Sequence, residues 1–198
     1  MATTKPPGGL KTVAPLLLKA PKAAKATATK SAAAKASTGK SAPASGMTGN
    51  QYRDLIASYI HHNYASAGLV VYLEVSLGKT VIGKDRNIDV FVVRPEDRKA
   101  VAIECKYQDS LGTVDEKIPY ALQDLEALWM PGILAYAGRG WSRGVLHSLE
   151  ASRLGANCLP DQTLARTKQT RELDHMLAAI FGFWDLVLPA NKKFKPAP

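Results

Sequence analysis

The sequence predicts an α/β (α+β) domain in which helices flank a central mixed sheet of four to five strands, preceded by a disordered N-terminal tail. Three observations lead to this prediction. Residues 1–46 are mainly Ala, Lys, Thr, Ser, Pro and Gly, with no aromatic residue, so they bury too little apolar surface to fold. Three strand-like runs lie between residues 69 and 107, after a helical pattern. Beyond them, helical patterns surround a short buried strand, which can join the sheet through a crossover helix.

The tail carries most of the positive charge of the chain. Residues 1–46 hold eight lysines and no acidic residue, whereas all seventeen acids lie after Met47 and nearly balance the basic residues there. A flexible polycation binds nucleic acid by releasing counterions, without reading its sequence. Lys30, Lys35 and Lys40 are therefore candidate DNA contacts, and a solubilising linker is the alternative. The chain divides into a basic tail, 1–46, and a folded domain, 47–198.

Composition also excludes several classes of protein. The apolar run Leu16-Leu17-Leu18 is too short for a signal peptide or a membrane span, so no membrane partner is expected. With only two cysteines, Cys105 and Cys158, the chain has neither a disulfide scaffold nor a cysteine-rich zinc site. The low cysteine content agrees with a reducing compartment, and the expected location is cytoplasmic or on DNA in the nucleoid.

The folded domain is predicted to begin with a helix and a strand. Residues 51–66 place five apolar side chains at helical spacing, namely Tyr52, Leu55, Ile56, Tyr59 and Ile60. Residues 69–76 are rich in β-branched and aromatic residues, which predicts a strand. The polar segment 78–86 contains glycine and connects this strand to the next one.

The next two strands are predicted to form a hairpin. Residues 87–93 and 100–107 are both rich in apolar and β-branched residues. The segment between them, Arg94-Pro95-Glu96-Asp97-Arg98-Lys99, has a proline followed by acidic residues, which is typical of a turn. The two runs should therefore pair antiparallel.

The second half of the domain is predicted to contain more helix than strand. A helix should begin at residues 112–115 and run to about residue 128, with Thr113 and Glu116 at the spacing of a capping box. The elements expected after it are a buried strand and two helices, at residues 132–137, 143–154 and 170–181. Residues 183–188 are interpreted either as a last strand or as a packed tail.

Alternation along the second hairpin strand gathers polar residues on one face. Side chains of a strand point alternately to its two faces, so Glu104, Lys106 and Gln108 share one face and Cys105 points to the other. Asp89, on the partner strand, can meet Glu104 if the register allows it. Two carboxylates and a lysine at a sheet surface make a candidate site for a hard divalent cation beside a group that orients water.

This arrangement resembles the PD-(D/E)XK nuclease superfamily, the restriction-endonuclease-like fold. The family pattern is an acid on one strand followed by acid-X-lysine on the next, each flanked by apolar residues. Here the pattern is Ile88-Asp89-Val90 followed by Ile103-Glu104-Cys105-Lys106. The resemblance covers roughly residues 51–137. The chain departs from many family members because its first helix carries no glutamate.

The resemblance implies a Mg²⁺-dependent deoxyribonuclease that hydrolyses phosphodiester bonds, with Mn²⁺ as a substitute metal. The implied metal ligands are Asp89, Glu104 and the backbone carbonyl of Cys105. Glu74 on the first strand is the candidate for a third acid, because the first helix offers only Asp54 and no glutamate.

Lys106 and Gln108 complete the catalytic set that the resemblance implies. A lysine beside two carboxylates is expected to have a raised pKa, so we expect Lys106 to orient water and stabilise charge rather than act as a base. Gln108 lies two residues further on, where several family members carry a glutamine on the same face.

Four residues outside this cluster are candidate DNA contacts. Lys117 and Gln123 belong to the helix after the site strand, where they can face the site. Arg139 and Arg143 belong to the glycine-rich segment 138–144, which opens a helix. Backbone N–H groups at a helix start can hold a phosphate, and a plain glycine turn is the alternative.

Two other functions stay open. In the first, the chain is a non-enzymatic DNA-binding or DNA-compacting protein whose folded part is an inactive nuclease-like core. In the second, the segment 138–144 binds a nucleotide in an enzyme of another type. A nuclease with one site per chain would need a homodimer to cut both strands. A phage or bacterial origin is compatible with the nuclease interpretation.

Overall fold

The computed structural model describes residues 46–110, 112 and 114–195, which build a five-stranded sheet with helices on both faces. The strands are β1 (Val70–Lys79), β2 (Asp85–Arg94), β3 (Lys99–Tyr107), β4 (Gly132–Ala137) and β5 (Gly155–Asn157), and they lie in this order across the sheet. The pairs β1–β2 and β2–β3 are antiparallel, and β3–β4 and β4–β5 are parallel. The mixed sheet predicted from the sequence is therefore confirmed.

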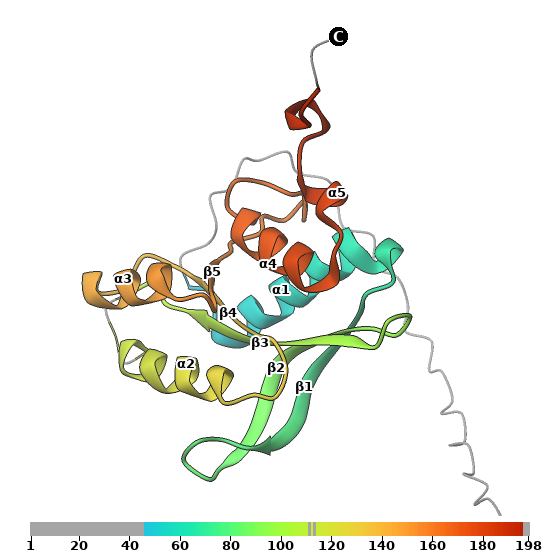
Figure 1. Cartoon of the computed structure of the whole chain (residues 1–198). Coiled ribbons are helices and arrows are strands. Elements are labelled where there is room, and N and C mark those ends of the chain that lie inside the picture. Colours follow the sequence, from blue (N-terminus) through green and yellow to red (C-terminus); the bar gives the residue numbers. More distant parts are fainter. Residues whose placement is uncertain (1–45, 111, 113, 196–198) are drawn as a thin grey trace, which may run out of the picture. The chain divides into compact units, whose positions relative to one another are not determined.

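The described helices form two layers, one on each face of the sheet. They are α1 (Gly49–Tyr64), α2 (Ile118–Glu126), α3 (Arg143–Ala151), α4 (Arg171–Phe181) and the single turn α5 (Trp184–Val187). Helices α1 and α4 pack on one face, and α2 and α3 pack on the other (Figure 1). A crossover through α2 carries the chain from β3 to β4, which makes these two strands parallel.

Helix α1 begins at a capping box that the sequence pattern did not single out. The side chain of Thr48 accepts from the backbone N–H of Gln51 at 3.3 Å, and the side chain of Gln51 accepts from the backbone N–H of Thr48 at 2.8 Å. Two of the otherwise unpaired N–H groups at the helix start are satisfied in this way. The predicted helix over residues 51–66 is confirmed, with its start two residues earlier.

Alternation along β3 assigns its side chains to the two faces of the sheet. Ile103 and Cys105 join the core under α1 and α4. Ala102 joins the second core, under α2 and α3. Glu104 and Lys106 have the same parity as Ala102, and therefore project from the face that α2 and α3 cover.

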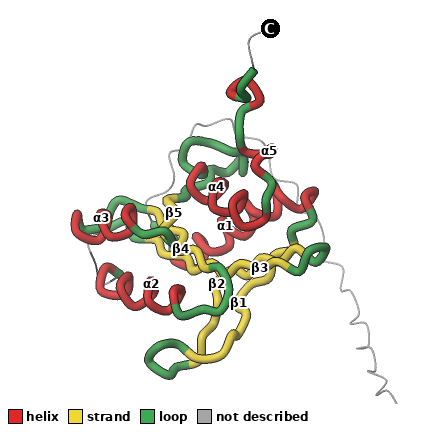
Figure 2. Tube along the Cα trace, viewed as in Figure 1, coloured by secondary structure: helices red, strands yellow, loops and turns green. Residues whose placement is uncertain are grey.

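Strands β1 and β2 kink together beside the catalytic candidates. Ile88 packs in the core under α2 although Val90, with the same parity, packs under α1. In β1, Glu74 has a left-handed backbone with φ of 53°, and the pairing of Leu73 with Val90 and of Val75 with Ile88 places it beside Asp89. The register of β1 and β2 shifts further along, between Ser76 and Lys79, and a bulge of this kind adds to the bend. The far end of the β1–β2 hairpin consequently projects past α2 (Figure 2).

The helix predicted from residue 112 begins later than expected. Asp115–Lys117 form a 3-10 turn, and α2 starts only at Ile118. Pro119 stands in the first turn of α2, the position that tolerates a missing N–H. Thr113, the expected capping residue, lies outside the described residues.

Two expectations near the C-terminus are corrected. Helix α3 ends at Ala151, and the three residues of β5 follow it, a strand too short to produce a detectable period-two pattern. The interpretation of residues 183–188 as a last strand is wrong, because Trp184–Val187 form the single helical turn α5.

Candidate active site

Glu104 and Lys106 form an ion pair on the helix-covered face of β3. The Lys106 Nζ atom donates to Glu104 Oε1. Both side chains are mostly buried, with 23% of Glu104 and 19% of Lys106 exposed. Two residues apart on one strand, they occupy the same face, as the period of two requires.

Asp89 reaches this pair because β2 separates from β3 at this point. The last paired residues are Val90 and Ile103. Beyond them the Asp89 carboxylate takes the place of a backbone partner, and its Oδ2 accepts from the backbone N–H of Cys105 at 2.8 Å. The acid therefore lies against the Glu104–Cys105 peptide.

The backbone carbonyl of Cys105 points to the same side as Asp89. Even-numbered residues of this region donate toward β4, as shown by Ala102 N–H to Pro131 and Gln108 N–H to Ala137. In a strand, the N–H and C=O of one residue point to the same neighbour. The Cys105 carbonyl is thus directed into the gap left by β2, next to the Asp89 carboxylate.

The three side chains form one electrostatic cluster. Burial raises the pKa of Glu104, and the charge of Asp89 raises it further, although Lys106 acts in the opposite direction. Burial lowers the pKa of Lys106, but the charges of Glu104 and Asp89 outweigh it, and the pKa of Lys106 lies above its usual value. Lys106 is therefore protonated at neutral pH, which suits charge stabilisation and not proton abstraction.

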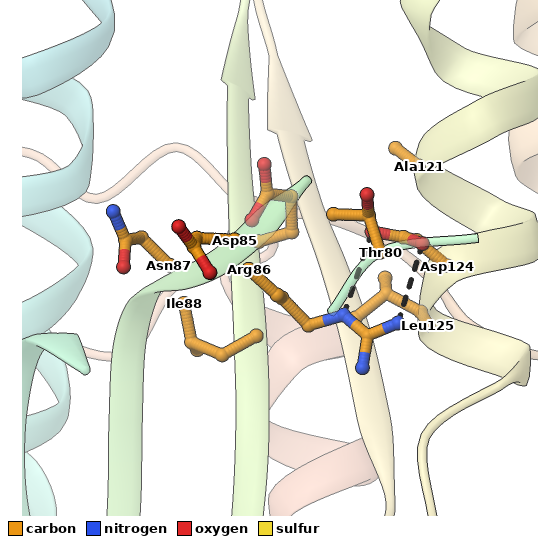
Figure 3. Close-up of a pocket in the computed structure, with 9 residues that line it drawn as sticks. Thr80, Asp85, Arg86, Asn87, Ile88, Ala121, Asp124 and Leu125 are labelled. Carbon is orange, nitrogen blue, oxygen red and sulfur yellow. Dashed lines mark hydrogen bonds and ion pairs between the residues drawn. The ribbon is translucent and has the colours of Figure 1, made fainter. Parts of the chain in front are cut away.

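A cavity of about 260 Å³ opens beside Glu104. It lies between the far end of the β1–β2 hairpin, β3 and α2 (Figure 3). Its walls are made by nine residues, Thr80, Asp85, Arg86, Asn87, Ile88, Glu104, Ala121, Asp124 and Leu125. Substrate atoms entering it would meet the Glu104 side chain from the direction of α2.

Arg86 and Asp124 form a polar contact across this cavity that the sequence did not indicate. Arg86 Nη2 lies 3.3 Å from Asp124 Oδ1, and its Nε donates to Oδ2 at 3.5 Å (Figure 3). Asp124 Oδ1 also accepts from the backbone N–H of Val81 at 2.7 Å. The Asp124 carboxylate of α2 is therefore bonded both to β2, at Arg86, and to the turn of the β1–β2 hairpin, at Val81. The sequence predicts that residues 78–86 form a connection between strands. In the structure β1 runs on to Lys79 and β2 begins at Asp85, and this places Arg86 in β2 with its side chain turned inward.

The structure does not bring Gln108 into the cluster. Gln108 follows the end of β3 and is 4% exposed. Its Nε2 donates to Asp115 Oδ1 at 2.8 Å and to the Gly140 carbonyl at 2.7 Å, and its Oε1 accepts from Val114 N–H at 3.1 Å. With all its amide atoms bonded to protein, Gln108 ties the β3–α2 loop to the β4–α3 loop.

Glu74 is likewise directed away from the cluster. Its carboxylate forms an ion pair with Arg53 of α1, which also pairs with Asp54. Helix α1 covers the face of the sheet opposite to Glu104. The left-handed backbone of Glu74 breaks the alternation from which a shared face was expected.

Of the candidate DNA contacts, four lie on the surface of the described structure. Lys117 and Gln123 are exposed on the 3-10 turn and on α2, the helix that borders the cavity. Arg139 is exposed in the loop between β4 and α3, and Arg143 is exposed as the first residue of α3. The tail lysines Lys30, Lys35 and Lys40 lie outside the described residues.

Two backbone amides in the glycine-rich segment 138–144 are already bonded to protein acceptors. Gly140 N–H donates to the Gln108 carbonyl at 2.9 Å, and Ser142 N–H donates to Asp115 Oδ2 at 3.1 Å. Trp141 is buried, and its Nε1 donates to the Ala137 carbonyl at 3.1 Å. The segment is therefore built as a packed turn, and these two amides are not available to a phosphate.

No group of three or more His, Cys, Asp or Glu side chains in residues 46–110, 112 and 114–195 is placed to hold a metal ion, so the cluster offers two carboxylates. Within the same residues, no helix has the length and apolar character needed to cross a membrane.

Comparisons with known proteins identify one family. A family model described as a PD-(D/E)XK nuclease superfamily domain matches residues 48–184 of the chain. A crystal structure of a protein of unknown function, AF1548, aligns with a TM-score of 0.34 and 13% identity, over 71% of this chain and 91% of that one. No curated protein matches the sequence.

Proposed function

Because the chain belongs to the PD-(D/E)XK nuclease superfamily, we propose that it is a metal-dependent DNA nuclease that hydrolyses phosphodiester bonds at Asp89, Glu104 and Lys106. A nuclease-type domain accounts for most of the chain. The observation that carries the proposal for these residues is the hydrogen bond from Cys105 N–H to Asp89. It fixes one acid beside the Glu104–Lys106 pair, at the edge of a cavity.

The oxygen atoms of this cluster fit a hard divalent cation. Asp89 Oδ2 and Glu104 Oε1 are engaged, and within the described residues the second oxygen of each carboxylate has no hydrogen-bond partner. The Cys105 carbonyl, on the Asp89 side of β3, is the third proposed ligand. Carboxylate and carbonyl oxygens with several waters are the ligands that Mg²⁺ prefers, and Mn²⁺ accepts the same set.

A bound divalent cation supplies charge neutralisation for the phosphodiester and lowers the pKa of a coordinated water. The protein residues do the rest in this proposal. Asp89 and Glu104 would hold the cation, whose positive charge would offset the repulsion between the two carboxylates. Lys106, which is protonated, donates hydrogen bonds to the attacking water or to a phosphate oxygen and stabilises the negative charge that develops there.

We assign DNA as the substrate from the distribution of charge. The tail, residues 1–46, holds eight lysines and no acid, and would bind the phosphate backbone without sequence preference. Lys117, Gln123, Arg139 and Arg143, exposed on the folded part, are proposed to add phosphate contacts. In this organisation the tail, 1–46, anchors the nuclease domain, 47–198, to DNA, and cutting of both strands would use a homodimer.

The test is cleavage of supercoiled plasmid by the full-length chain, in Mg²⁺ and in EDTA. We expect cutting in Mg²⁺ only. Asp89→Asn should reduce the rate at least about a hundredfold, because a metal ligand worth several kcal/mol in the transition state is lost. Asp97→Asn, in the β2–β3 turn, is the matched control and should cut normally.

Other outcomes would decide against the proposal. Cutting that persists in EDTA, or in the Asp89→Asn variant, would exclude this metal site. Plasmid that is retarded in a gel but never cut would support the alternative, a DNA-binding or DNA-compacting protein with an inactive nuclease-like core. That alternative is favoured by the tail charge alone, which needs no active site to bind DNA.

A further inference from the structure

We propose that the end of the β1–β2 hairpin, residues 75–88, is a DNA-binding arm that enters the major groove beside the cleaved phosphate. In this proposal Val81 and Ile82 at its tip contact the bases. The inference rests on the proposed nuclease function, because it is that function which brings duplex DNA to the cavity next to the arm.

The arm ends in two exposed aliphatic side chains. Val81 is 49% exposed and Ile82 is 61% exposed. The turn that carries them is closed by Thr80 N–H to the Lys84 carbonyl at 2.8 Å and by Gly83 N–H to the Thr80 carbonyl at 2.9 Å. Turns ordinarily carry Gly, Asn, Asp, Pro or Ser, and exposed apolar side chains gathered in one place indicate a surface that binds something.

The tip is tied to α2 beside the cavity at Glu104. Asp124 of α2 accepts from Val81 N–H at 2.7 Å and pairs with Arg86 of the arm. The arm and the catalytic acid also share one strand, because Asp89 directly follows the arm in β2. An element fixed in this way loses little conformational entropy when it binds.

The charge of the arm fits nucleic acid better than an apolar partner. Residues 75–88 contain three basic side chains, Lys79, Lys84 and Arg86, and one acid, Asp85. Lys79, which pairs with Asp85 at 2.6 Å, and Lys84 are exposed on either side of the apolar tip, where they can contact the phosphates that border a groove. With three basic residues and one acid, the arm has a net positive charge, which is unfavourable for contact between two copies of the same tip.

The shape of the arm fits the groove that carries sequence information. The major groove is about 12 Å wide and admits a two-stranded β-ribbon. Its apolar features are thymine methyl groups, which are the natural contacts for Val81 and Ile82. Five residues of the arm also line the cavity at Glu104, namely Thr80, Asp85, Arg86, Asn87 and Ile88, so a DNA strand in that cavity would lie directly against the arm.

The experiment compares Ile82→Ser with Leu188→Ser in the full-length chain. Leu188 is 53% exposed and lies after α5, outside the arm and the cavity. Each variant is tested on a short DNA duplex and on bis(p-nitrophenyl) phosphate, a diester too small to fill the cavity and also reach the tip of the arm. Salt is raised to about 0.3 M, because binding by the lysine tail weakens steeply with salt, whereas an apolar contact does not.

We expect Ile82→Ser to lower kcat/KM for the duplex about tenfold. This is the change expected when the binding free energy from partial burial of one aliphatic side chain is lost. Hydrolysis of the small diester should be unchanged, and Leu188→Ser should behave as wild type on both substrates. The inference is overturned if Ile82→Ser cuts the duplex as well as wild type, or if it loses activity equally on both substrates.

A binding measurement separates failure of the arm from failure of the nuclease. Fluorescence anisotropy of a labelled duplex, at the same salt and with Ca²⁺ in place of Mg²⁺, should show about tenfold weaker binding for Ile82→Ser. If wild type cuts nothing, the proposed function fails and this measurement still decides on the arm. Equal binding by both proteins, with a change only in oligomeric state, would identify the tip as a contact between copies of the chain and overturn the inference.

Discussion

The carboxylate of Asp89 accepts a hydrogen bond from the backbone N–H of Cys105 at 2.8 Å, so a side chain replaces a backbone partner at the point where β2 leaves β3. This contact has two consequences. It satisfies the backbone N–H of the buried Cys105, which would otherwise be unpaired. It also places a negative charge next to Glu104, where solvent has little access.

The first prediction separates these two consequences. Asp89→Ala removes the only acceptor that the described structure offers to Cys105 N–H, and should lower the free energy of unfolding by about 1–3 kcal/mol. Asp89→Asn keeps an acceptor oxygen, so its free energy of unfolding should fall by less than that of Asp89→Ala. Urea unfolding of the metal-free proteins measures both values. Equal stability of the two variants would mean that the hydrogen bond is not formed in solution.

A second prediction concerns the pH dependence of metal binding. The pKa of Glu104 is raised, by burial first and by the charge of Asp89 in addition. A protonated carboxyl is a poor ligand, so protons compete with the metal up to a higher pH than for an ordinary glutamate. Mn²⁺ affinity, measured by calorimetry between about pH 5 and 8, should therefore weaken as the pH falls through this raised pKa.

Lys106→Met provides the matched variant for this titration. The positive charge of Lys106 opposes the upward shift of the Glu104 pKa, so its removal should move the loss of affinity to still higher pH. Metal affinity that does not depend on pH, or a midpoint that moves downward in Lys106→Met, would contradict the assignment of Glu104 as a ligand coupled to Lys106.

The third prediction concerns the contact between Arg86 and Asp124. Asp124→Ala leaves the mostly buried Arg86 without its partner and Val81 N–H without its acceptor. We expect a loss of about 2 kcal/mol in the free energy of unfolding, less than for fully buried pairs because Asp124 is partly exposed. Arg86→Met should lower the free energy of unfolding by less, because Asp124 still accepts a hydrogen bond from Val81 N–H.

A double-mutant cycle shows whether these effects are coupled. Combining Arg86→Met with Asp124→Ala should cost no more than Asp124→Ala alone, because the unpaired charge is removed. Asp85→Ala, which breaks the exposed Lys79–Asp85 pair of the same hairpin, is the control and should change stability little. Additive losses in the cycle would show that Arg86 and Asp124 act independently.

Much of the fold, and the shared face of Glu104 and Lys106 in the candidate site, could be predicted from the sequence, because they depend on local rules. Alternation along a strand places Glu104 and Lys106 on one face and Cys105 on the other, and this requires no knowledge of the rest of the chain. The order of helices and strands follows from hydrophobic periodicity. The register that brings Asp89 to Cys105 is a tertiary property and had to come from the structure.

The positions of two candidate site residues, Glu74 and Gln108, differ from the sequence-based expectation because a local rule does not hold there. Glu74 stands at a left-handed kink, so period two no longer predicts its face. Gln108 has the right parity but follows the end of β3, where the loops bury it and use its whole amide. Asp124 and Arg86 belong to no recognisable sequence motif. Their contact depends on how far the β1–β2 hairpin extends over α2.

The fourth prediction decides between packing and phosphate binding for the segment 138–144. Gly138 has φ of +104°, and a Cβ there would lie 2.0 Å from the Gln108 carbonyl oxygen. Gly138→Ala should therefore destabilise the protein by more than about 2 kcal/mol, through backbone strain and overlap. Gly144 is the control, because a Cβ there meets nothing within 4 Å and Gly144 lies in the first turn of α3, where alanine is the better helix former.

Thermal unfolding and phosphate binding distinguish the two roles. If the glycines serve packing, Gly138→Ala lowers the melting temperature, Gly144→Ala keeps or raises it, and inorganic phosphate stabilises neither wild type nor Gly144→Ala. A phosphate-binding segment would instead give a wild-type protein whose melting temperature rises with phosphate, because a ligand that binds only the native state stabilises it. The amides of Gly140 and Ser142, already bonded to Gln108 and Asp115, lead us to expect the first result.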